Sequence, residues 1–383
     1  MSLVFCEDCD GFDYSTGTTD TGYQYVNKTG VMYSAYTSFQ ATGGRFGTGC
    51  MIRGGSNAGS QQLDWALVNR TPDDTGVAGL EHYFGFWLQS SAAYPSNIGG
   101  RLLRRYGSSV AGPNVMNSIS PLGVGGNGIL FAAQVGQFTG GAKTLAQGVR
   151  TVADGRWHWV EFAWRRNTAL TASGAPNGRV ALYVDGVLEF DYNNVMTTNY
   201  ADSGLDRLNN VWSLAYMVSS ATPVVNTLYD DIMLWNNQGT EFNTFPIGPQ
   251  RLVRLAPAAA SGVPQFVPNV NGQTNVQAVT QGWNRAKGVS SNGVSGAVDM
   301  YTTSGAANVS NIRGVTINQT GRAQKQNLTT RARIQVGATV RESADQTVTP
   351  ADRNRQILFS QNQNNAQWSQ SDINSLVIGY KAM

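Results

Sequence analysis

Apolar and polar residues alternate with a period of two along much of the N-terminal half of the chain, a pattern typical of β-strands. The stretch Glu81–Leu88 sends His82 to one face and Tyr83 to the other, with further aromatic residues on both sides. The stretch Trp157–Trp164 alternates in the same way. Aromatic residues on both faces of a strand indicate that both faces are covered, so these stretches predict strands inside a sandwich.

The clearest local signal is a hairpin. The runs Arg179–Val184 and Val187–Phe190 are joined by Asp185-Gly186, and an Asp-Gly pair supplies the two positive φ angles of a type I′ turn. Turn-rich loops separate four further predicted strands: Gly49–Arg53, Ile129–Val135, Val211–Val218 and Leu228–Trp235. Short strands at this spacing predict an all-β sandwich or jelly roll.

The chain changes character near residue 247. Three prolines fall within residues 246–257, and acidic residues are absent between Glu241 and Asp299. We therefore expect a jelly-roll domain over residues 1–246, a linker over 247–262 and a small β-rich domain over 263–383.

The C-terminal part predicts weaker strands and one short terminal helix. The strands are Ala297–Thr302, Asn311–Gln319, Leu328–Val336, Gln356–Ser360 and Val377–Tyr380. Within Trp368–Leu376, Ser369 is followed three residues later by Asp372, which is the signature of a helix N-terminus with a capping box.

Composition and charge limit the kinds of partner that the protein is expected to bind. The 383 residues include 44 glycines, which excludes long helices, and 13% are charged. Residues 1–246 carry 14 Lys/Arg against 19 Asp/Glu, and residues 247–383 carry 13 against 5. The C-terminal cations are dispersed among neutral residues, so we expect no nucleic-acid partner. No window reaches the ~18 apolar residues of a membrane span, so we expect no membrane insertion.

Three cysteines are too few for a disulfide scaffold, and the single C-x-x-C pair Cys6/Cys9 lacks the second pair of a zinc site. Reduced thiols are one interpretation. The other is a disulfide: if the N-terminal strand pairs with the strand at Cys50, then Cys6 or Cys9 approaches Cys50 and leaves one thiol for an intermolecular bond.

Acid–base chemistry has few candidates. His82 and His158 both lie in aromatic strands, where a structural histidine is favoured, and no nucleophile elbow or P-loop is present. Glu189 and Asp191 are the best glycosidase pair, since with Asn193 they share one face of a strand. A solvated strand face explains the same pattern, so we assign no catalytic residue.

A metal site has weak sequence support. Asp64, Asp230 and Asp231 offer carboxylates for calcium, but a calcium site needs six or more oxygens and adjacent residues of a strand point oppositely. We predict no metal and no cofactor, with calcium as the alternative.

Two motifs resemble concanavalin A-like lectin/glucanase domains, particularly laminin G-like ones. The runs Asp154–Phe162 and Gly178–Gly186 are similar to a "DGxWHxV … LYVDG" core, and Leu228–Trp235 is similar to a "DDIxxW" closing strand. The resemblance covers residues 1–246. Asn193 departs from the glucanase Glu-x-Asp-x-Glu pattern, which argues against glucanase catalysis.

The order of motifs along the whole chain also resembles structural proteins of tailed bacteriophages. These motifs are the start Phe5–Asp13, the glycine-rich strand Gly44–Cys50, the Gly-Pro-x-Arg segment Gly248–Arg251 and the ending Trp368–Gly379. The resemblance implies a virion location, with assembly in the host cytoplasm.

From this resemblance we expect a non-enzymatic virion structural protein of the tail, fibre or capsid surface. Its lectin-like domain would be displayed, and its C-terminal domain would bind other virion proteins, as a homo-oligomer. One alternative is an adhesin that binds bacterial surface glycan through unidentified residues. The second alternative is a glycoside hydrolase or depolymerase that uses Glu189 and Asp191.

Overall fold

The computed structural model is almost entirely β-structure, which confirms the predicted all-β fold class. It describes residues 3–9, 37–53, 65–68, 79–90, 100–106, 118–124, 130–138, 141–152, 154–165, 175–195, 197, 211–214, 227–240, 242–280, 288–321, 323, 327–349 and 353–383. Contacts divide these residues into two compact units, one extending to Leu252 and the other comprising Val253–Met383. In the described part, no helix is long and apolar enough to cross a membrane.

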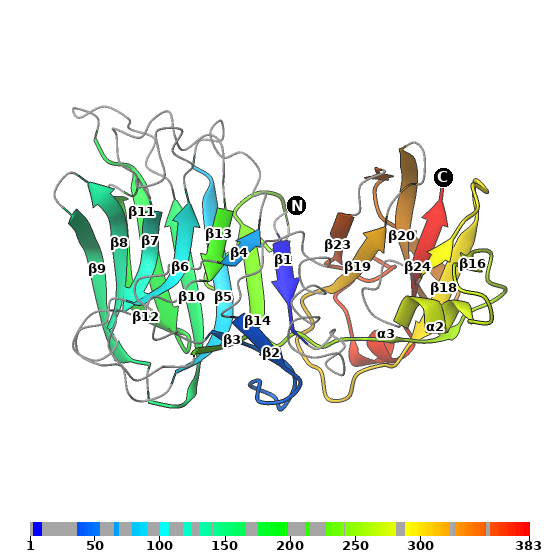
Figure 1. Cartoon of the computed structure of the whole chain (residues 1–383), viewed down its shortest axis with the longest axis horizontal. Coiled ribbons are helices and arrows are strands. Elements are labelled where there is room, and N and C mark those ends of the chain that lie inside the picture. Colours follow the sequence, from blue (N-terminus) through cyan, green and yellow to red (C-terminus); the bar gives the residue numbers. More distant parts are fainter. Residues whose placement is uncertain are drawn as a thin grey trace. The chain divides into compact units, whose positions relative to one another are not determined.

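Two antiparallel sheets make up the N-terminal unit (Figure 1). Among the described residues, sheet A has eight strands in the order β12-β11-β10-β5-β14-β3-β2, with β1 also paired to β14. Their bounds are β1 Leu3–Glu7, β2 Thr37–Gln40, β3 Cys50–Arg53, β5 Glu81–Ser90, β10 Trp157–Arg165, β11 Gly178–Val184, β12 Val187–Val195 and β14 Thr227–Asn236.

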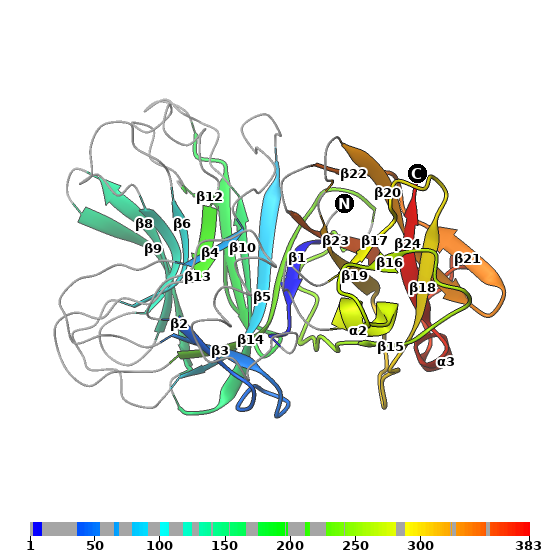
Figure 2. The same ribbon diagram turned by 45° about the vertical axis from the view of Figure 1, so that its right-hand side comes forward.

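Sheet B has six described strands in the order β4-β13-β6-β7-β8-β9. They are β4 Trp65–Val68, β6 Gly100–Tyr106, β7 Ser118–Val124, β8 Leu130–Phe138, β9 Gly141–Thr151 and β13 Val211–Leu214. Figure 2 shows β6, β8 and β9 as a layer separate from β5, β10 and β12 of sheet A. This two-layer arrangement is the expected jelly-roll sandwich.

The two faces of sheet A are both covered, as the double aromatic pattern predicted. One face, called the core face here, carries the buried Phe84, Phe86 and Phe162. The opposite face is covered by residues 244–251, which we call the strap, so the strap face is the side of sheet A that carries Tyr83 and Glu161. The predicted hairpin is confirmed, since Asp185 and Gly186 have φ of 51° and 77° at its turn.

The strap is tied to sheet A by specific bonds. The N–H groups of Ile247 and Gly248 donate to the carboxylate of Glu161 at 2.7 and 3.0 Å. The indole of Trp87 donates to the Gln250 carbonyl at 2.8 Å, and the rings of Phe245 and Tyr83 stack with centroids 5.0 Å apart. The predicted linker 247–262 therefore begins with residues that pack on the sandwich.

The C-terminal unit is also antiparallel. Its main sheet has the described order β15-β18-β24-β20-β21, with β22 on β20, and two further pairs are β16-β17 and β19-β23. The bounds are β15 Pro257–Ala260, β16 Val267–Pro268, α2 Asn275–Thr280, β17 Val289–Ser290, β18 Val298–Thr303, β19 Val315–Gly321, β20 Leu328–Val336, β21 Thr339–Glu342, β22 Gln346–Val348, β23 Arg353–Phe359, α3 Gln370–Asn374 and β24 Val377–Ala382.

The short terminal helix forms where the sequence predicts it. Ser369 is the N-cap of α3, and the reciprocal bonds with Asp372 complete the capping box. The helix packs Ile373 into a core that includes Trp368, Ile334 and Phe359.

The condition behind the proposed cysteine pairing is not met. The N-terminal strand pairs with β14, placing Cys6 opposite Met233, and β3, which begins at Cys50, pairs with a different part of β14 at Thr227–Tyr229. Cys6, Cys9 and Cys50 are buried as thiols. Burial raises the pKa of the Cys50 thiol to about 11, with a smaller opposing effect of the bond from Gln40. A disulfide among the three stays a prediction for the oxidised protein.

Candidate functional site

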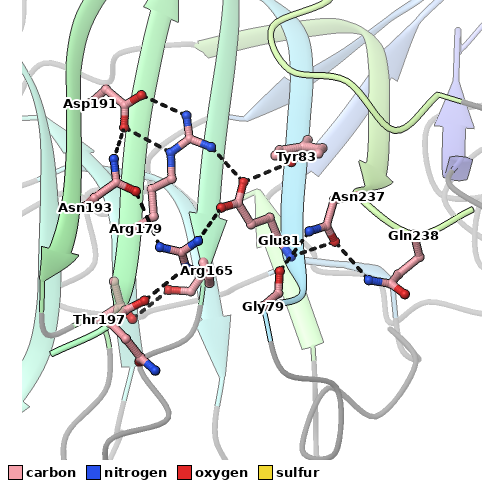
Figure 3. Close-up of polar contacts among 11 residues, drawn as sticks. Gly79, Glu81, Tyr83, Arg165, Arg179, Asp191, Asn193, Thr197, Asn237 and Gln238 are labelled. Atoms are coloured by element: carbon pink, nitrogen blue, oxygen red, sulfur yellow. Dashed lines mark hydrogen bonds and ion pairs between the residues drawn. The ribbon is translucent and has the colours of Figure 1, made fainter. Parts of the chain in front are cut away.

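A row of polar residues crosses the strap face at one end of sheet A (Figure 3). Glu81 on β5 is opposite Arg165 on β10, Arg165 is opposite Arg179 on β11, and Arg179 is opposite Asn193 on β12. Directly opposed like charges destabilise a sheet. The two arginines must therefore be neutralised by the groups beside them.

Two carboxylates supply that neutralisation. Glu81 accepts from Arg165 Nη1 at 3.0 Å and from Arg179 Nη1 at 2.7 Å. Asp191 holds the other edge of Arg179 in a bidentate pair, with distances of 3.0 Å to Nε and 2.8 Å to Nη2. The network is therefore electrically balanced, with two cations and two anions.

The environment of the network differs from one side to the other. The Glu81 side chain is only 8% exposed, whereas Asp191 is 27% exposed. The bond to Asp191, together with Glu81, raises the pKa of Arg179 above its usual range against the opposing effect of burial. Burial, reinforced by the Glu81 charge, raises the pKa of the Tyr83 hydroxyl, which donates to Glu81 at 2.9 Å.

The prediction that Glu189, Asp191 and Asn193 share one face of the strand is wrong for Glu189. A register shift occurs where Leu182 pairs with Phe190 and Tyr183 with Leu188, which leaves Glu189 as the extra residue of a β-bulge. Its carboxylate accepts from the Val149 and Arg150 N–H groups at 2.8 and 3.2 Å.

Glu189 thereby links the two sheets rather than facing substrate. It forms an ion pair with Arg150 Nε at 2.7 Å, and its side chain is 2% exposed. Asp191 is paired with Arg179 on the strap face. Because each carboxylate has its own arginine, the structure does not bring Glu189 and Asp191 together as an acid and a nucleophile.

The surroundings of both histidines indicate a structural role. His82 is fully buried, with its ring 6.1 Å from that of Trp164. His158 contacts Asp185 through Nδ1 at 2.8 Å and Asp154 through Nε2 at 3.0 Å. Burial would lower the pKa of His158, but the hydrogen bonds and charges of the two aspartates outweigh it and raise the pKa.

The calcium alternative gains no support from the described residues. Asp230 accepts from the N–H groups of Arg45 and Asp231, at 2.7 and 2.8 Å, so its oxygens face donors. Asp64 lies outside the described residues. Across the described ranges, no cluster of three or more His, Cys, Asp or Glu is placed to hold a metal.

The two sheets differ in the charges that their strands carry. The described strands of sheet B contain five cationic residues and no Asp or Glu; the cations are Arg101, Arg104, Arg105, Lys143 and Arg150. The strands of sheet A contain three cations and seven acids; the acids are Glu7, Glu81, Glu161, Glu189, Asp191, Asp230 and Asp231. Sheet B is therefore the basic layer of an otherwise acidic unit.

The arginines of β6 lie within the sheet and not at its rim. The strand β6 is bordered by β13 and β7, with Arg104 opposite Ser213 and Arg105 opposite both Trp212 and Ile119. Central strands are held in place from both sides by ladder hydrogen bonds, so they offer a rigid base for a binding surface.

Sequence reasoning missed Glu81, Arg165, Arg179 and the charge difference between the sheets. The first three are far apart in sequence, and only the strand register brings them into one row. The signal was present in the alternation of β10 and β11, where Arg165 and Arg179 fall on the same face as Glu161 and Tyr183. The sheet charges required knowing which strand belongs to which sheet.

Comparison with known proteins gives a fold likeness only. No protein-family model matches the sequence, and no curated protein is similar to it. Among solved structures, the chain is similar to an endo-β-1,4-glucuronan lyase from Trichoderma reesei, with 15% identity, a TM-score of 0.41 and coverage of 61% of this chain and 95% of that one.

Two other solved structures extend this picture. An alginate lyase from Aplysia kurodai is 10% identical, with a TM-score of 0.44 and coverage of 61% of this chain and 99% of that one. A carbohydrate esterase from the Shiga toxin-encoding bacteriophage phi24B is 10% identical, with a TM-score of 0.39 and coverage of 61% and 98%.

These matches contradict the expectation of a non-enzymatic virion structural protein. The three proteins are described as lyases and an esterase that act on carbohydrates, and none of them as a virion structural component. At these identities and TM-scores the likeness extends to the fold alone, so substrate and site must be inferred from this chain's own residues.

Proposed function

We propose that the N-terminal unit is a depolymerase that cleaves an acidic polysaccharide, with sheet B as its substrate face. The observation that carries this proposal is the charge of the described sheet B strands, which contain no acid and five cations, one of which, Arg150, is paired with Glu189 of sheet A. A surface of one sign attracts a polymer of the opposite sign and raises its local concentration.

Arginine suits a uronic acid polymer better than lysine would. Its planar guanidinium matches a carboxylate in a bidentate pair, which fixes orientation as well as charge. Three arginines lie on β6, and Arg105 is opposite Trp212 on the neighbouring strand.

The strap explains why sheet B, and not sheet A, is assigned to substrate. On the strap face of sheet A, the rings of Tyr83 and Tyr183 are in contact with Phe245 of the strap. The Trp87 indole donates to Gln250 of the same segment. Tyr83 and Trp87 are buried, and Tyr183 and Phe245 are only partly exposed, so this face does not offer an extended platform for a long polymer.

Neutralising the uronate carboxylate also favours elimination over hydrolysis. An arginine at the carboxylate makes the neighbouring C5–H more acidic, so that a base removes this proton while the C4–O bond breaks. The electron pair forms a C4=C5 double bond, and the departing oxygen takes up a proton. Hydrolysis would instead need two carboxylates with access to substrate, and Glu189 and Asp191 are each engaged with an arginine.

The experiment incubates the full chain with alginate, glucuronan and acidic bacterial capsular polysaccharides and follows ultraviolet absorbance and reducing ends together. A lyase gives both signals, because its product is unsaturated, and a hydrolase gives reducing ends alone. Because consecutive residues of a strand belong to opposite faces, we assign substrate contact to Arg105, and Arg105→Ala should lower kcat/KM by about tenfold or more, mainly through KM. Arg156→Ala is the matched control, because this arginine is 83% exposed in a loop outside sheet B.

Two results would overturn the proposal: no cleavage of any acidic polymer, or equal cleavage by Arg105→Ala and the parent protein. In this proposal the predicted partner, a bacterial surface glycan, is the substrate. The virion location, the homo-oligomer and the binding of other virion proteins stay predictions.

A further inference from the structure

A second sugar-binding site, separate from sheet B, is indicated by the polar row on the strap face of sheet A. The exposed end of this row carries Asp191 and Asn193 on β12, with Arg165 and Arg179 beside them. We propose that these residues, with the neighbouring rings of Tyr183 and Phe245, bind a neutral sugar residue. This inference does not depend on the proposed depolymerase activity.

The hydrogen-bonding capacity of the row is only partly used. Arg165 donates from Nε to the Asn177 carbonyl, from Nη1 to Glu81 and from Nη2 to Asn193. Arg179 donates from Nε and Nη2 to Asp191 and from Nη1 to Glu81. A guanidinium has five N–H groups, so in these described contacts each arginine retains donors for a ligand.

Asn193 makes the weakest hydrogen bonds in the row. Its amide oxygen accepts from Arg165 at 3.4 Å, and its amide nitrogen donates to Asp191 at 3.4 Å. Both distances lie beyond the usual range for an N–H···O bond. The exposed amide can therefore exchange these weak contacts for bonds to a ligand hydroxyl at little cost, because its present partners keep stronger bonds of their own.

Aromatic rings flank the polar groups on one side. The Phe245 ring lies 5.5 Å from that of Tyr183, and the Arg179 guanidinium carbon is 5.9 Å from the Phe245 centroid. Both rings are half-buried, so part of each faces solvent. A sugar ring has an apolar C–H face and a rim of hydroxyls, and this combination of a ring beside fixed donors and acceptors matches both.

Charge balance decides the class of sugar. Because Glu81 and Asp191 neutralise Arg165 and Arg179, the row has no net charge to attract an acidic ligand. An incoming carboxylate would also face the Asp191 carboxylate at close range. Vicinal hydroxyls both donate and accept, so a neutral hexose can bond to Asp191 and Asn193 together.

The network also holds these groups in place before any ligand arrives. Glu81 is buried and fixes both guanidiniums, and Asp191 is fixed by the bidentate pair. A ligand therefore avoids much of the entropy cost of ordering the side chains.

The test titrates the full chain with neutral oligosaccharides of glucose, galactose and mannose by calorimetry and by NMR. We expect binding of at least one of them, weakened about tenfold or more by Asn193→Ala, which corresponds to loss of one or two hydrogen bonds. Tyr183→Ala provides a second variant that leaves the ion pairs unchanged. Asn364→Ala, an exposed asparagine of the C-terminal unit, is the control.

Three outcomes would overturn the site. They are no binding of any neutral oligosaccharide, binding that neither Asn193→Ala nor Tyr183→Ala weakens, and equal displacement of the bound sugar by an oligouronate. In the first two cases the row is only a structural ion-pair network, and in the third the site does not select neutral sugars. Cleavage of acidic polymers should be unchanged in Asn193→Ala, so failure of this site and failure of the depolymerase proposal are separate results.

Discussion

The carboxylate of Glu161, in the middle of sheet A, accepts the N–H of Ile247 from the strap at 2.7 Å. Its second oxygen accepts the N–H of Gly248 at 3.0 Å. Glu161 is fully buried in the folded protein, and a buried carboxylate is tolerated only where donors replace the lost water. The strap is therefore part of the sandwich fold, although its proline-rich sequence suggests a linker.

We expect Glu161→Gln to destabilise the N-terminal unit by about 1–3 kcal/mol, since an amide can accept only one of the two N–H bonds and buries an NH₂ group against the other. Asp345→Asn provides the control, because this carboxylate is 58% exposed and its ion pair with Arg331 is worth little. Chemical unfolding of the full chain, followed by tryptophan fluorescence, measures both changes. Equal stability of Glu161→Gln and the parent protein would show that the strap is not needed for folding.

A pH dependence is expected from His158, whose two ring nitrogens each contact an aspartate. Its pKa is raised in the folded protein because the bonds to Asp185 and Asp154 outweigh the effect of burial. A raised folded-state pKa means that the stabilisation is complete below about 6.5, the value for the unfolded chain, and is lost as pH rises through the folded-state pKa.

The difference in Tm between the parent protein and His158→Gln should therefore shrink as the pH is raised from about 6 towards 9. Asp154 has a lowered pKa, through hydrogen bonds from His158 and Arg156 that outweigh burial, so its own contribution is lost only in acid. Thermal unfolding at a series of pH values tests this, with NMR titration of the His158 ring as a direct check. A constant difference in Tm over that range would contradict it.

Strands with strong alternation could be predicted from sequence, and this accounts for β5, β10 and the β11–β12 hairpin. The strand β9, with the sequence GAKTLAQGVRT, has no such alternation because it carries small and polar residues throughout. Its pairing with β8 depends on ladder hydrogen bonds, which any residue except proline can make. Composition therefore gives no signal for it.

The candidate site was harder to predict than the strands. The sequence singled out Asp191 and Asn193 but placed Glu189 beside them, because period-two reasoning has no means of detecting a bulge. Glu81, Arg165 and Arg179 become neighbours only through strand order. The packing of the strap on sheet A could not be predicted for a related reason, since its partner Glu161 is 86 residues from Ile247 and local proline content is typical of a linker.

In the C-terminal unit, Asp299 is expected to contribute most through hydrogen bonds. It is buried, and its carboxylate accepts from the Tyr301 hydroxyl at 2.5 Å, from the Asn275 amide at 2.6 Å and from the Gln265 N–H at 3.0 Å. These bonds attach α2 and the segment before it to β18.

Asp299→Ala should lower the free energy of unfolding by about 3 kcal/mol or more, because it leaves several buried donors without an acceptor. Tyr301→Phe removes a single bond and should cost about 1 kcal/mol. Urea titration of the full chain gives both values. If Tyr301→Phe cost as much as Asp299→Ala, the hydroxyl and not the carboxylate would be the centre of this network.

The contact between Gly148 and Glu189 gives the last prediction. A Cβ at Gly148 would lie 2.9 Å from Glu189 Oε2. Glu189 cannot withdraw without losing its bonds to Val149 and Arg150, which join the edge strands of the two sheets. Gly148→Ala should therefore destabilise the N-terminal unit by about 1–3 kcal/mol.

Gly288→Ala is the matched control, since the nearest atom to a Cβ there is the Asn269 side-chain nitrogen at 3.7 Å, an ordinary contact. Thermal unfolding of both variants distinguishes a local clash from a general effect of replacing glycine. If Gly148→Ala were as stable as Gly288→Ala, the Glu189 carboxylate would be able to move away from β9. Glu189 would then be available for chemistry, and the assignment of this residue to the joint between the two sheets would fail.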